Sequence, residues 1–556
     1  MQSDFGAKKR IGYRSQAMAL GQRSGVVCFG LGSIDGCDAA WTNPDGWMPH
    51  ERAVVHVTAG NHRLDAFGGV PAQVLHTCDT EPAVWRLPVA QLQHVFEPDG
   101  KCPCGSGAEL WGVAFAACVV AADCAVMALN ALAKRHLAAP TNALGATPFA
   151  VNYLLGVTPL MACLYREKCA LHPDSWKTGR GVNKLQAIQE SVTYDCLDHG
   201  RVNLMLKKEV NPINFGDMKF PSKARGIQFC TNLRTAYELA TQQTSFCHAL
   251  AEATAIERSY AGIKCCVRYS AQMDPAAIGA FATESENRRA SYACSFIDER
   301  DGKNWDANVQ REHREALADW YGQISKELRE QALQQIKVRG RYTKGRVRVT
   351  YVVDGTVKSG HWDTSSGNGT LNLEVTMQAM VALPKALRPV EVRGLIMGDD
   401  LILWLYFDHA VDPLTYRDAI NAAEQRLGIH PVRGIFGDLL NASFCSMGFY
   451  RTSDGSYVAL PKVGRCLAKL FWTVTPRAGR DPARLASSIA HAFMPAYHGY
   501  RPMRLFLRHH MKVPPLEFSE SIGTFSYVLR EFQLPLTDNV LWHECHAVKY
   551  GLPPDA

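Results

Sequence analysis

The stretch Gly394–Phe407 reads GLIMGDDLILWLYF and places two adjacent carboxylates, Asp399 and Asp400, between two apolar runs. Like charges repel, and their burial costs free energy unless a positive charge pairs with them. Each apolar run has the length of a strand, and Gly398 with the two aspartates joins the runs as a tight turn. The acidic pair is therefore either a solvated turn or part of a site that holds a divalent cation.

The composition predicts a globular protein with room for about three domains. The chain has 556 residues, of which 47% are hydrophobic and 20% charged, and its net charge is +7. Ten Lys or Arg and one acidic residue, Asp481, lie between Pro461 and Pro514, which suits either a polyanionic partner or a solvated surface. The eighteen cysteines follow no regular framework, which favours reduced thiols, and no secretory signal opens the chain.

Two segments raise the question of a membrane. Leu110–Arg135 is rich in alanine but carries Asp123, and Ala146–Tyr165 is uncharged but is interrupted by prolines and a glycine. A spanning helix needs about twenty apolar residues without such breaks. Both segments are therefore predicted to be buried elements of the fold.

The hydrophobic periodicity predicts an α+β protein, with helices in the first half and alternating strands and helices in the second. We expect helices over 229–257 and 307–336, a hairpin turning at Asp354–Gly355, a helix from Thr370 to Leu383, a helix that starts at Asp412-Pro413 and ends at Gly428, and a hairpin turning at Asp454–Gly455.

A second acidic segment lies upstream of the Gly-Asp-Asp turn. Tyr292–Val309 reads YACSFIDERDGKNWDANV, an apolar run followed by Asp298, Asp301 and Asp306. A two-metal site for phosphoryl transfer needs carboxylates from more than one segment, and Mg²⁺ prefers oxygen ligands. The two segments together could supply such a site.

Two further segments could recognise a nucleotide. Asp363–Glu374 (DTSSGNGTLNLE) is predicted as a glycine-bearing loop that leads into a helix and offers hydrogen bonds to a sugar. Leu206–Phe229 is basic and could neutralise a triphosphate. Its cations are Lys207, Lys208, Lys219, Lys223 and Arg225.

The order of these motifs resembles the RNA-dependent RNA polymerases of positive-strand RNA viruses, with the small replicases of nodavirus-like and tombusvirus-like viruses nearest. Five elements occur in the family's order over about 207–470: K-K-E…K-x-R-x-I-Q, D-x4-D, S-S-G-N-G-T, G-D-D and the SFCS hairpin at Ser443–Ser446. Any one of them is a weak signal, whereas five in order are specific.

The resemblance implies an α+β right-hand fold with an antiparallel palm sheet and helix-rich fingers and thumb. The implied domains are an N-terminal extension at 1–110 that could bridge fingers and thumb, fingers at 111–290 with the basic segment 206–229, a palm at 291–460 with a fingers insertion near 320–360, and a thumb at 461–556.

The same resemblance implies template-directed RNA synthesis with two Mg²⁺ or Mn²⁺ ions, held by Asp301, Asp399 and Asp400, while Asp306 reads the ribose. The implied nucleotide-binding residues are Lys208, Lys223, Arg225, Ser366, Gly367, Thr370 and Asn372. The hairpin residues Ser443, Phe444, Cys445 and Ser446, with Lys462, would support the primer and RNA. The expected partners are a single-stranded RNA template, nascent RNA, nucleoside triphosphates and viral or host replication factors, in the host cytoplasm with membrane association left open.

Three departures from the family pattern leave alternatives open. Asp301 has the family's spacing to Asp306, but Asp298 sits directly at the end of the apolar run, and the one that is not the metal ligand is expected at the surface. The position where the family has an asparagine holds Glu374, which leaves open which side chain orients Asp306. Ser365 and Ser366 are alternatives in the same way.

The third departure concerns the general acid. The chain has no lysine between Lys385 and Lys462 to protonate pyrophosphate, which leaves His430 or Arg433 as substitutes by position. A histidine has a suitable pKa for proton transfer, whereas an arginine could only stabilise charge.

Two other functions compete with RNA synthesis: reverse transcription, against which Asp306 argues, and a catalytically inactive RNA-binding scaffold, against which the complete set of aspartates argues. A structural zinc at Cys102–Gly107 or His543–His546 is disfavoured, because neither segment completes a set of ligands at zinc-site spacing.

Overall fold

The structure is a computed structural model of the chain, and part of the chain is described below. The described residues are 29–34, 37–42, 53–59, 62–64, 73–76, 85–86, 108–110, 113–115, 118–119, 128, 131–132, 135–136, 144, 149–171, 200–207, 211–212, 225–230, 233–271, 273–302, 304–344, 347–361, 363–463, 466, 472–473, 482–497, 499–515 and 540–550.

A six-stranded sheet, the central sheet, has the strand order β13-β14-β18-β19-β15-β20. β14 and β18 run parallel, and the other neighbouring pairs are antiparallel. The strands are β13 (Arg258–Tyr260), β14 (Ile263–Tyr269), β15 (Cys294–Gly302), β18 (Glu391–Met397), β19 (Asp400–Phe407) and β20 (Pro431–Phe436).

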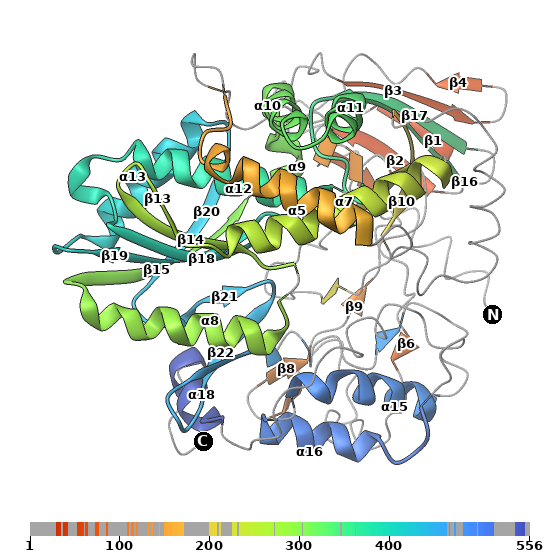
Figure 1. Cartoon of the computed structure of the whole chain (residues 1–556). Coiled ribbons are helices and arrows are strands. Elements are labelled where there is room, and N and C mark those ends of the chain that lie inside the picture. Colours follow the sequence, from red (N-terminus) through yellow and green to blue (C-terminus); the bar gives the residue numbers. More distant parts are fainter. Residues whose placement is uncertain are drawn as a thin grey trace.

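The central sheet is covered on both faces, which explains why the run after the two aspartates is apolar at every position. Leu403 and Leu405 of β19 belong to one hydrophobic core, and Ile402 and Trp404 belong to the other. α8 (Pro275–Arg288) packs in the second core and lies on the opposite side of the sheet from the helices of the first core (Figure 1). The helices of the first core include α5 (Thr158–Leu171), α7 (Leu233–Thr254), α10 (Arg311–Gly322), α12 (Thr364–Val381) and α13 (Pro413–Arg426).

A second six-stranded sheet, the flanking sheet, has the order β12-β10-β16-β17-β3-β4. Its strands are β12 (Gly226–Cys230), β10 (Arg201–Leu206), β16 (Lys337–Lys344), β17 (Val347–Asp354), β3 (Ala53–Ala59) and β4 (His62–Leu64). The first 110 residues thus contribute two strands beside β17, and they also contribute β6 (Trp85–Arg86), which pairs with β24 (Trp472–Thr473) near the other end of the sequence.

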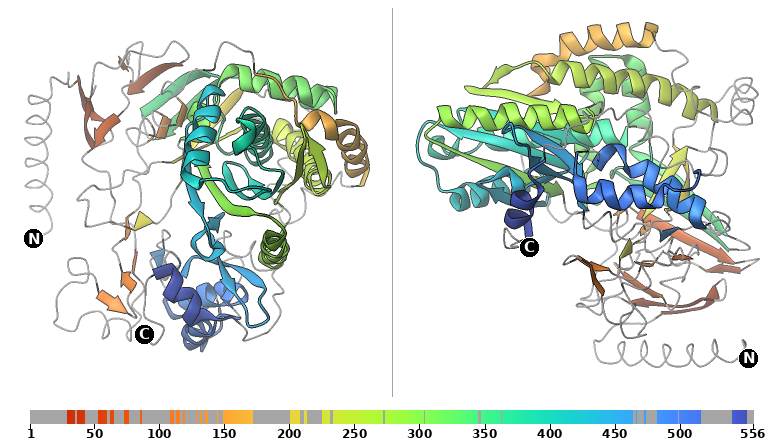
Figure 2. Two further views of the ribbon diagram at one scale, coloured as in Figure 1. Left: turned by 90° about the vertical axis from the view of Figure 1, so that its left-hand side faces the viewer. Right: turned by 90° about the horizontal axis from the view of Figure 1, so that it is seen from below.

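The remaining elements are short. The strands are β1 (Phe29–Ile34), β2 (Cys37–Thr42), β5 (Gln73–His76), β7 (Ala108–Leu110), β8 (Val113–Phe115), β9 (Cys118–Val119), β11 (Asn211–Pro212), β21 (Ser443–Phe444), β22 (Met447–Arg451) and β23 (Tyr457–Pro461). The helices are η3 (Leu154–Val157), η5 (Arg289–Ser291), α9 (Trp305–Asn308), α11 (Lys326–Gln334), η6 (Lys385–Leu387), η7 (Leu439–Asn441), α15 (Pro482–Phe493), η9 (Pro495–Tyr497), α16 (Arg501–His510) and α18 (Trp542–Tyr550). α15 and α16 lie at the lower end of the molecule, away from α5 and α7 (Figures 1 and 2).

The α+β class is confirmed, and so are several of the expected elements. β18 and β19 are the two strands on either side of the Gly-Asp-Asp turn, and α7 occupies most of 229–257. Asp412 caps α13 by accepting a hydrogen bond from the Thr415 amide at 2.8 Å, and Gly428 follows the helix at φ +82°. The hairpin of β22 and β23 turns at Asp454–Gly455 as expected.

The expected hairpin at Asp354–Gly355 is wrong, because Asp354 ends β17, and the hairpin of β16 and β17 turns where Lys344 pairs with Val347. The residues after Gly355 make their hydrogen bonds elsewhere. The Thr356 amide donates to the Val309 carbonyl, and the Val357 amide donates to the Asp306 carbonyl, each at 3.1 Å. A favourable turn dipeptide therefore marks a loop here and not a hairpin.

Two expected helices have different bounds. The segment 307–336 holds α10 and α11 as separate helices. Ser325 caps the start of α11, because its hydroxyl accepts a hydrogen bond from the Leu328 amide. α12 begins at Thr364, six residues before the expected start, so the serines and glycines of Asp363–Glu374 form helical turns. In the described part of the chain, no helix is long and apolar enough to cross a membrane.

A buried network of ion pairs ties β15 and β20 of the central sheet to α13. The Arg433 guanidinium contacts Asp298 at 2.7 Å and Glu424 at 2.9 Å, and Arg300 contacts Glu424 at 2.5 Å. All four side chains are fully buried. Removal of one member would leave an uncompensated charge in the interior.

We predict that Arg433→Met lowers the free energy of unfolding by about 3 to 5 kcal/mol, because it leaves Asp298 and Glu424 short of a buried cation. Urea denaturation followed by circular dichroism measures the change. Arg417→Met is the control, since Arg417 pairs with Asp418 at the surface and such pairs contribute only about 0 to 1 kcal/mol. Equal losses in the two variants would contradict a structural role for the network.

Candidate active site

The predicted acidic residues meet at one end of the central sheet. Arg300 of β15 pairs with Leu401 of β19, so the next residue of β15, Asp301, lies beside Asp400. Gly398 adopts φ +63°, which permits the tight turn between β18 and β19 that carries Asp399. The sheet register therefore brings together carboxylates that are about one hundred residues apart in sequence.

The four predicted carboxylates are close enough to interact electrostatically. Burial and then repulsion from Asp400, Asp306 and Asp301 raise the pKa of Asp399 from 3.8 to about 6. Asp301 itself is exposed, and the Asp399–Asp400 pair is partly buried. The end of the sheet is thus a concentration of negative charge that a cation would stabilise.

The side chain of Asn372 binds the backbone of the acidic turn. Its side-chain amide donates to the carbonyls of Gly398 at 3.0 Å and Asp399 at 3.1 Å. Gly369, one turn earlier in α12, lets the helix approach, because a Cβ there would lie 3.0 Å from the Tyr269 ring and 3.5 Å from the Gly398 nitrogen. Asn372, which the sequence placed on the nucleotide, is in this structure a support of the turn.

Asp306 is bound by three side chains that the sequence reading did not select. The Arg135 guanidinium contacts its Oδ2 at 3.0 Å, the Ser359 hydroxyl donates to the same oxygen, and the Asn368 amide donates to Oδ1 at 3.3 Å. Asn368 precedes Asn372 by four residues, so both face the acidic end from one side of α12. That spacing was the signal in the sequence that could have revealed Asn368.

The other predicted residues of α12 make their contacts with neighbouring residues of the protein. The Ser366 hydroxyl donates to the Gln243 side chain at 3.3 Å, and the Thr370 hydroxyl donates to the Ser366 carbonyl at 2.7 Å. A Cβ at Gly367 would lie 3.1 Å from the Asp363 carboxylate. Ser365 lies closer than Ser366 to the strand that leads into the acidic turn, since its hydroxyl is 2.9 Å from the Tyr269 hydroxyl of β14 and 3.4 Å from the Met397 sulfur at the end of β18.

Glu374 has a structural role that explains its place in the motif. Its carboxylate accepts hydrogen bonds from the backbone amides of Asn152 at 2.6 Å, Tyr153 at 2.9 Å and Leu154 at 3.1 Å. These amides open η3, where a negative charge is favourable. Glu374 therefore fixes the start of η3 and α5 against α12, and the amide that contacts Asp306 comes from Asn368 instead.

The structure separates the competing residues at the other acidic segment. Asp298 is fully buried against Arg433, so the expectation that the spare carboxylate lies at the surface is wrong. The same pairing encloses the Arg433 guanidinium, which is therefore unavailable to a ligand. His430 is partly buried and immediately precedes β20, whose Val432 pairs with Asp301, and its Nδ1 has no hydrogen-bond partner among the described residues.

The SFCS hairpin packs against the acidic turn. The Ser443 amide and hydroxyl both donate to the Glu299 carboxylate at 2.7 Å. Phe444 is buried, and Cys445 and Ser446 form the tip at φ +50° and +65°. Burial, and then Asp400, raise the pKa of the Cys445 thiol well above its usual value. The exposed Lys462 follows β23, and its amide donates to the Ser446 carbonyl at 3.1 Å.

The basic segment reaches the site through β12. Lys208 and Lys223 lie outside the described residues, and Arg225 is exposed just before β12. The Gln228 amide of β12 donates to the Ser359 carbonyl at 2.5 Å, and the Ser359 side chain binds Asp306. The flanking sheet is thereby tied to the acidic end of the central sheet.

The donor set suits a hard divalent cation, since carboxylate oxygens are what Mg²⁺ and Mn²⁺ prefer. Across the described residues, no three metal-ligating side chains are already grouped closely enough to hold a metal ion. Of the two zinc candidates, Cys102–Gly107 lies outside the described residues. In the other, His543–His546, the Cys545 thiol accepts a hydrogen bond from the Arg451 amide at 3.2 Å.

Compared with known proteins, the chain matches no family model and no curated sequence.

We predict that Asp399→Asn stabilises the protein above pH 6 and not near pH 4. The folded state raises the pKa of Asp399 from 3.8 to about 6, so wild type loses stability as pH rises through that interval, by up to about 3 kcal/mol. Asparagine does not titrate and escapes this loss. Urea denaturation at several pH values measures the difference. Asp418→Asn, at an exposed position of α13, is the control, and a pH-independent effect of Asp399→Asn would contradict the prediction.

Proposed function

We propose that this protein is an RNA-dependent RNA polymerase of the right-hand type, with the central sheet as its palm. The observation that carries the proposal is the meeting of Asp301, Asp399, Asp400 and Asp306 at one end of that sheet, where burial and then the other three carboxylates raise the pKa of Asp399. The order of the motifs in the sequence supports the same function. Carboxylates from two segments beside a side chain that can read a ribose suit nucleotidyl transfer.

The domain assignment follows from this proposal. The flanking sheet with α10 and α11 would belong to the fingers, and α15 and α16 would belong to the thumb. The N-terminal residues would connect the two, since β3 pairs with β17 and β6 pairs with β24. The right-hand arrangement is thus consistent with pairings between segments distant in sequence.

Asp301, Asp399 and Asp400 would hold two Mg²⁺ or Mn²⁺ ions. Such ions, when bound, lower the pKa of an attacking hydroxyl and stabilise the charge of a leaving pyrophosphate. The cost of placing these carboxylates together is the reason that the site favours cations.

The protein's own side chains would orient the reactants. Asp306, bound by Asn368, would accept a hydrogen bond from the ribose 2′-hydroxyl. Arg225, with Lys208 and Lys223, would contact the triphosphate. The hairpin tip at Cys445 and Ser446 would place the primer's 3′-hydroxyl for attack on the α-phosphate, after which pyrophosphate leaves. The Nδ1 atom of His430, which is buried and has no hydrogen-bond partner among the described residues, would be the position from which a proton is supplied to the pyrophosphate.

We predict that Asp399→Ala abolishes nucleotide incorporation, with a loss of at least about 10²- to 10³-fold, because it removes electrostatic stabilisation of the reacting phosphate. Purified protein is given a short single-stranded RNA template, labelled nucleotides and Mg²⁺ or Mn²⁺. RNA binding by the variant should persist. Asp418→Ala is the matched control on α13. RNA binding without product by wild type, across both metals and with or without primer, would overturn the proposal in favour of an inactive scaffold.

We also predict that Asp306 sets the choice of sugar. Wild type should prefer a ribonucleotide to its 2′-deoxy analogue by about 10²-fold or more, since a site built to bind a hydroxyl rejects the analogue that lacks it. Asp306→Ala should bring that ratio down by at least about tenfold. The ratio of kcat/KM for the two nucleotides is the measurement, and Asp418→Ala again serves as control. An unchanged ratio would assign sugar recognition elsewhere.

A further inference from the structure

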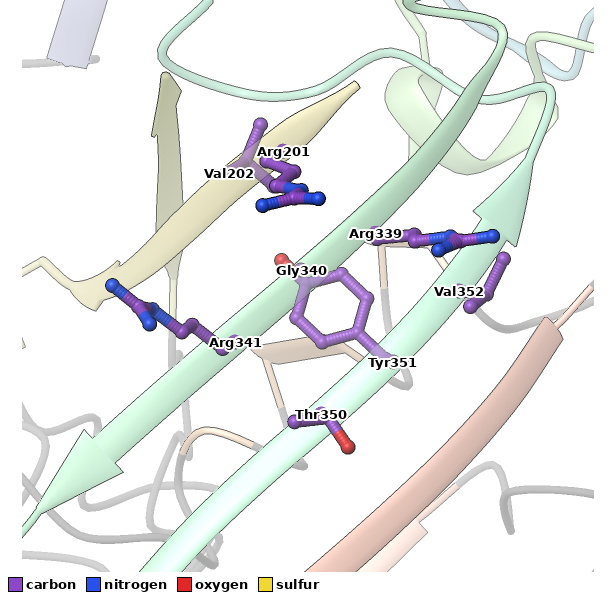
Figure 3. Close-up of a pocket in the computed structure, with 8 residues that line it drawn as sticks. All are labelled: Arg201, Val202, Arg339, Gly340, Arg341, Thr350, Tyr351 and Val352. Atoms are coloured by element: carbon purple, nitrogen blue, oxygen red, sulfur yellow. The ribbon is translucent and has the colours of Figure 1, made fainter. Parts of the chain in front are cut away.

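A cavity of ≈350 Å³ opens on the flanking sheet, over β10, β16 and β17. Its lining residues are Arg201, Val202, Arg339, Gly340, Arg341, Thr350, Tyr351 and Val352. None of these residues belongs to the candidate active site. Figure 3 shows Arg201 beside β16, with the side chains of Arg339 and Arg341 on either side of Gly340.

The three arginines lie on one face of the sheet. Arg339 and Arg341 are exposed and alternate with the buried Val338, Gly340 and Tyr342. Arg201 of β10 pairs with Arg339 in parallel register, so it lies beside that arginine on the neighbouring strand. The strands are about 4.8 Å apart, and the sheet therefore places three arginines at neighbouring positions of one face.

The charges of the cavity are of one sign. Every charged residue of its lining is an arginine. Asn203, the neighbour of Arg341 on β10, accepts a hydrogen bond from its Nε at 2.8 Å and thereby orients the guanidinium. An anion bound among these guanidinium groups would be attracted by positive charges from two neighbouring strands. Guanidinium groups match the geometry of phosphate oxygens.

Apolar side chains continue the same face beyond the cavity. Phe229 of β12 pairs with Asn203, and Met205 lies two residues further along β10. Phe229 is 40% exposed and Met205 is 50% exposed. A sheet face that combines arginines with an exposed aromatic ring is suited to a single strand of nucleic acid, because phosphates bind the cations while an unpaired base stacks on the ring.

The face is also joined to the candidate active site. Phe229 follows Gln228, whose amide donates to the Ser359 carbonyl, and Ser359 binds Asp306. A free nucleotide would use the arginines alone, whereas a strand of RNA would use the arginines and the apolar positions together. The extent of the face, over three strands, favours the strand.

From these observations we infer that the outer face of β12, β10 and β16 binds single-stranded RNA, with Arg201, Arg339 and Arg341 on its phosphates and Phe229 against a base. This inference rests on the proposed function. The face is a binding surface separate from the acidic end, and it retains RNA beside the site where nucleotides would be joined.

The test compares wild type with the double variant Arg339→Gln/Arg341→Gln. Fluorescence anisotropy with a short labelled single-stranded RNA gives Kd over a range of salt concentrations. The variant should bind about tenfold or more weakly at low salt, and the slope of log K against log salt should flatten by about 1.4, which corresponds to two lost phosphate contacts. Both arginines are exposed, so the thermal unfolding midpoint should stay close to that of wild type.

Two further variants separate the contributions. Phe229→Ala should weaken binding about threefold or more with the salt slope unchanged, because stacking releases no counterions. Arg417→Gln/Arg426→Gln removes the same charge from α13, where Arg417 is partly exposed and Arg426 is exposed, and should change Kd by less than about twofold. A loss as large in this control as in Arg339→Gln/Arg341→Gln would reduce the effect to net charge and overturn the inference.

The remaining outcomes distinguish the inference from the proposed function. A double variant that binds RNA like wild type, while wild type incorporates nucleotides, overturns the inference alone. A double variant that loses affinity for ATP but retains RNA binding also overturns it, in favour of a nucleotide subsite. If wild type incorporates no nucleotide but binds RNA through these arginines, the proposed RNA-binding face is supported and the proposed polymerase function is overturned.

Discussion

The carboxylates at the end of the central sheet repel each other, and the surrounding structure holds them together against that repulsion. Asp301 lies one residue before the end of β15, Asp400 begins the adjacent β19, and Asp399 lies in the turn between β18 and β19. Burial, and then their proximity, raise the pKa of Asp399. A loose turn would let these groups move apart, so their convergence requires a rigid frame.

That frame has three parts. The hydrophobic cores on both faces of β19 hold the strands of the sheet in place. Asn372 binds the carbonyls of the acidic turn, and Gly369 allows α12 to come close enough for that contact. The ion pairs of Arg300, Asp298, Glu424 and Arg433 tie β15 and β20 to α13 below the acidic end. Each part uses buried polar or apolar contacts that tolerate little movement.

The residues of α12 show how closely support and function can be interleaved. Asn368 reaches Asp306 and Asn372 reaches the turn, four residues later on the same face of the helix. Glu374 points elsewhere and binds the amides at the start of η3. A motif read as one loop with one purpose is therefore a helix that connects three different parts of the molecule.

The sequence by itself determined the strands on either side of Asp399 and Asp400, the helix after Asp412, and the hairpin at Asp454–Gly455, because local periodicity and turn residues carry those signals. It also selected the acidic residues, since their type and spacing are written in the chain. Tertiary structure alone decided that Asp298 pairs with Arg433 while Asp301 lies beside Asp400, that Arg135 and Ser359 bind Asp306, and that Asp354–Gly355 leads into a loop. These outcomes depend on contacts between residues far apart in sequence, and no local pattern contains the distance between two such side chains.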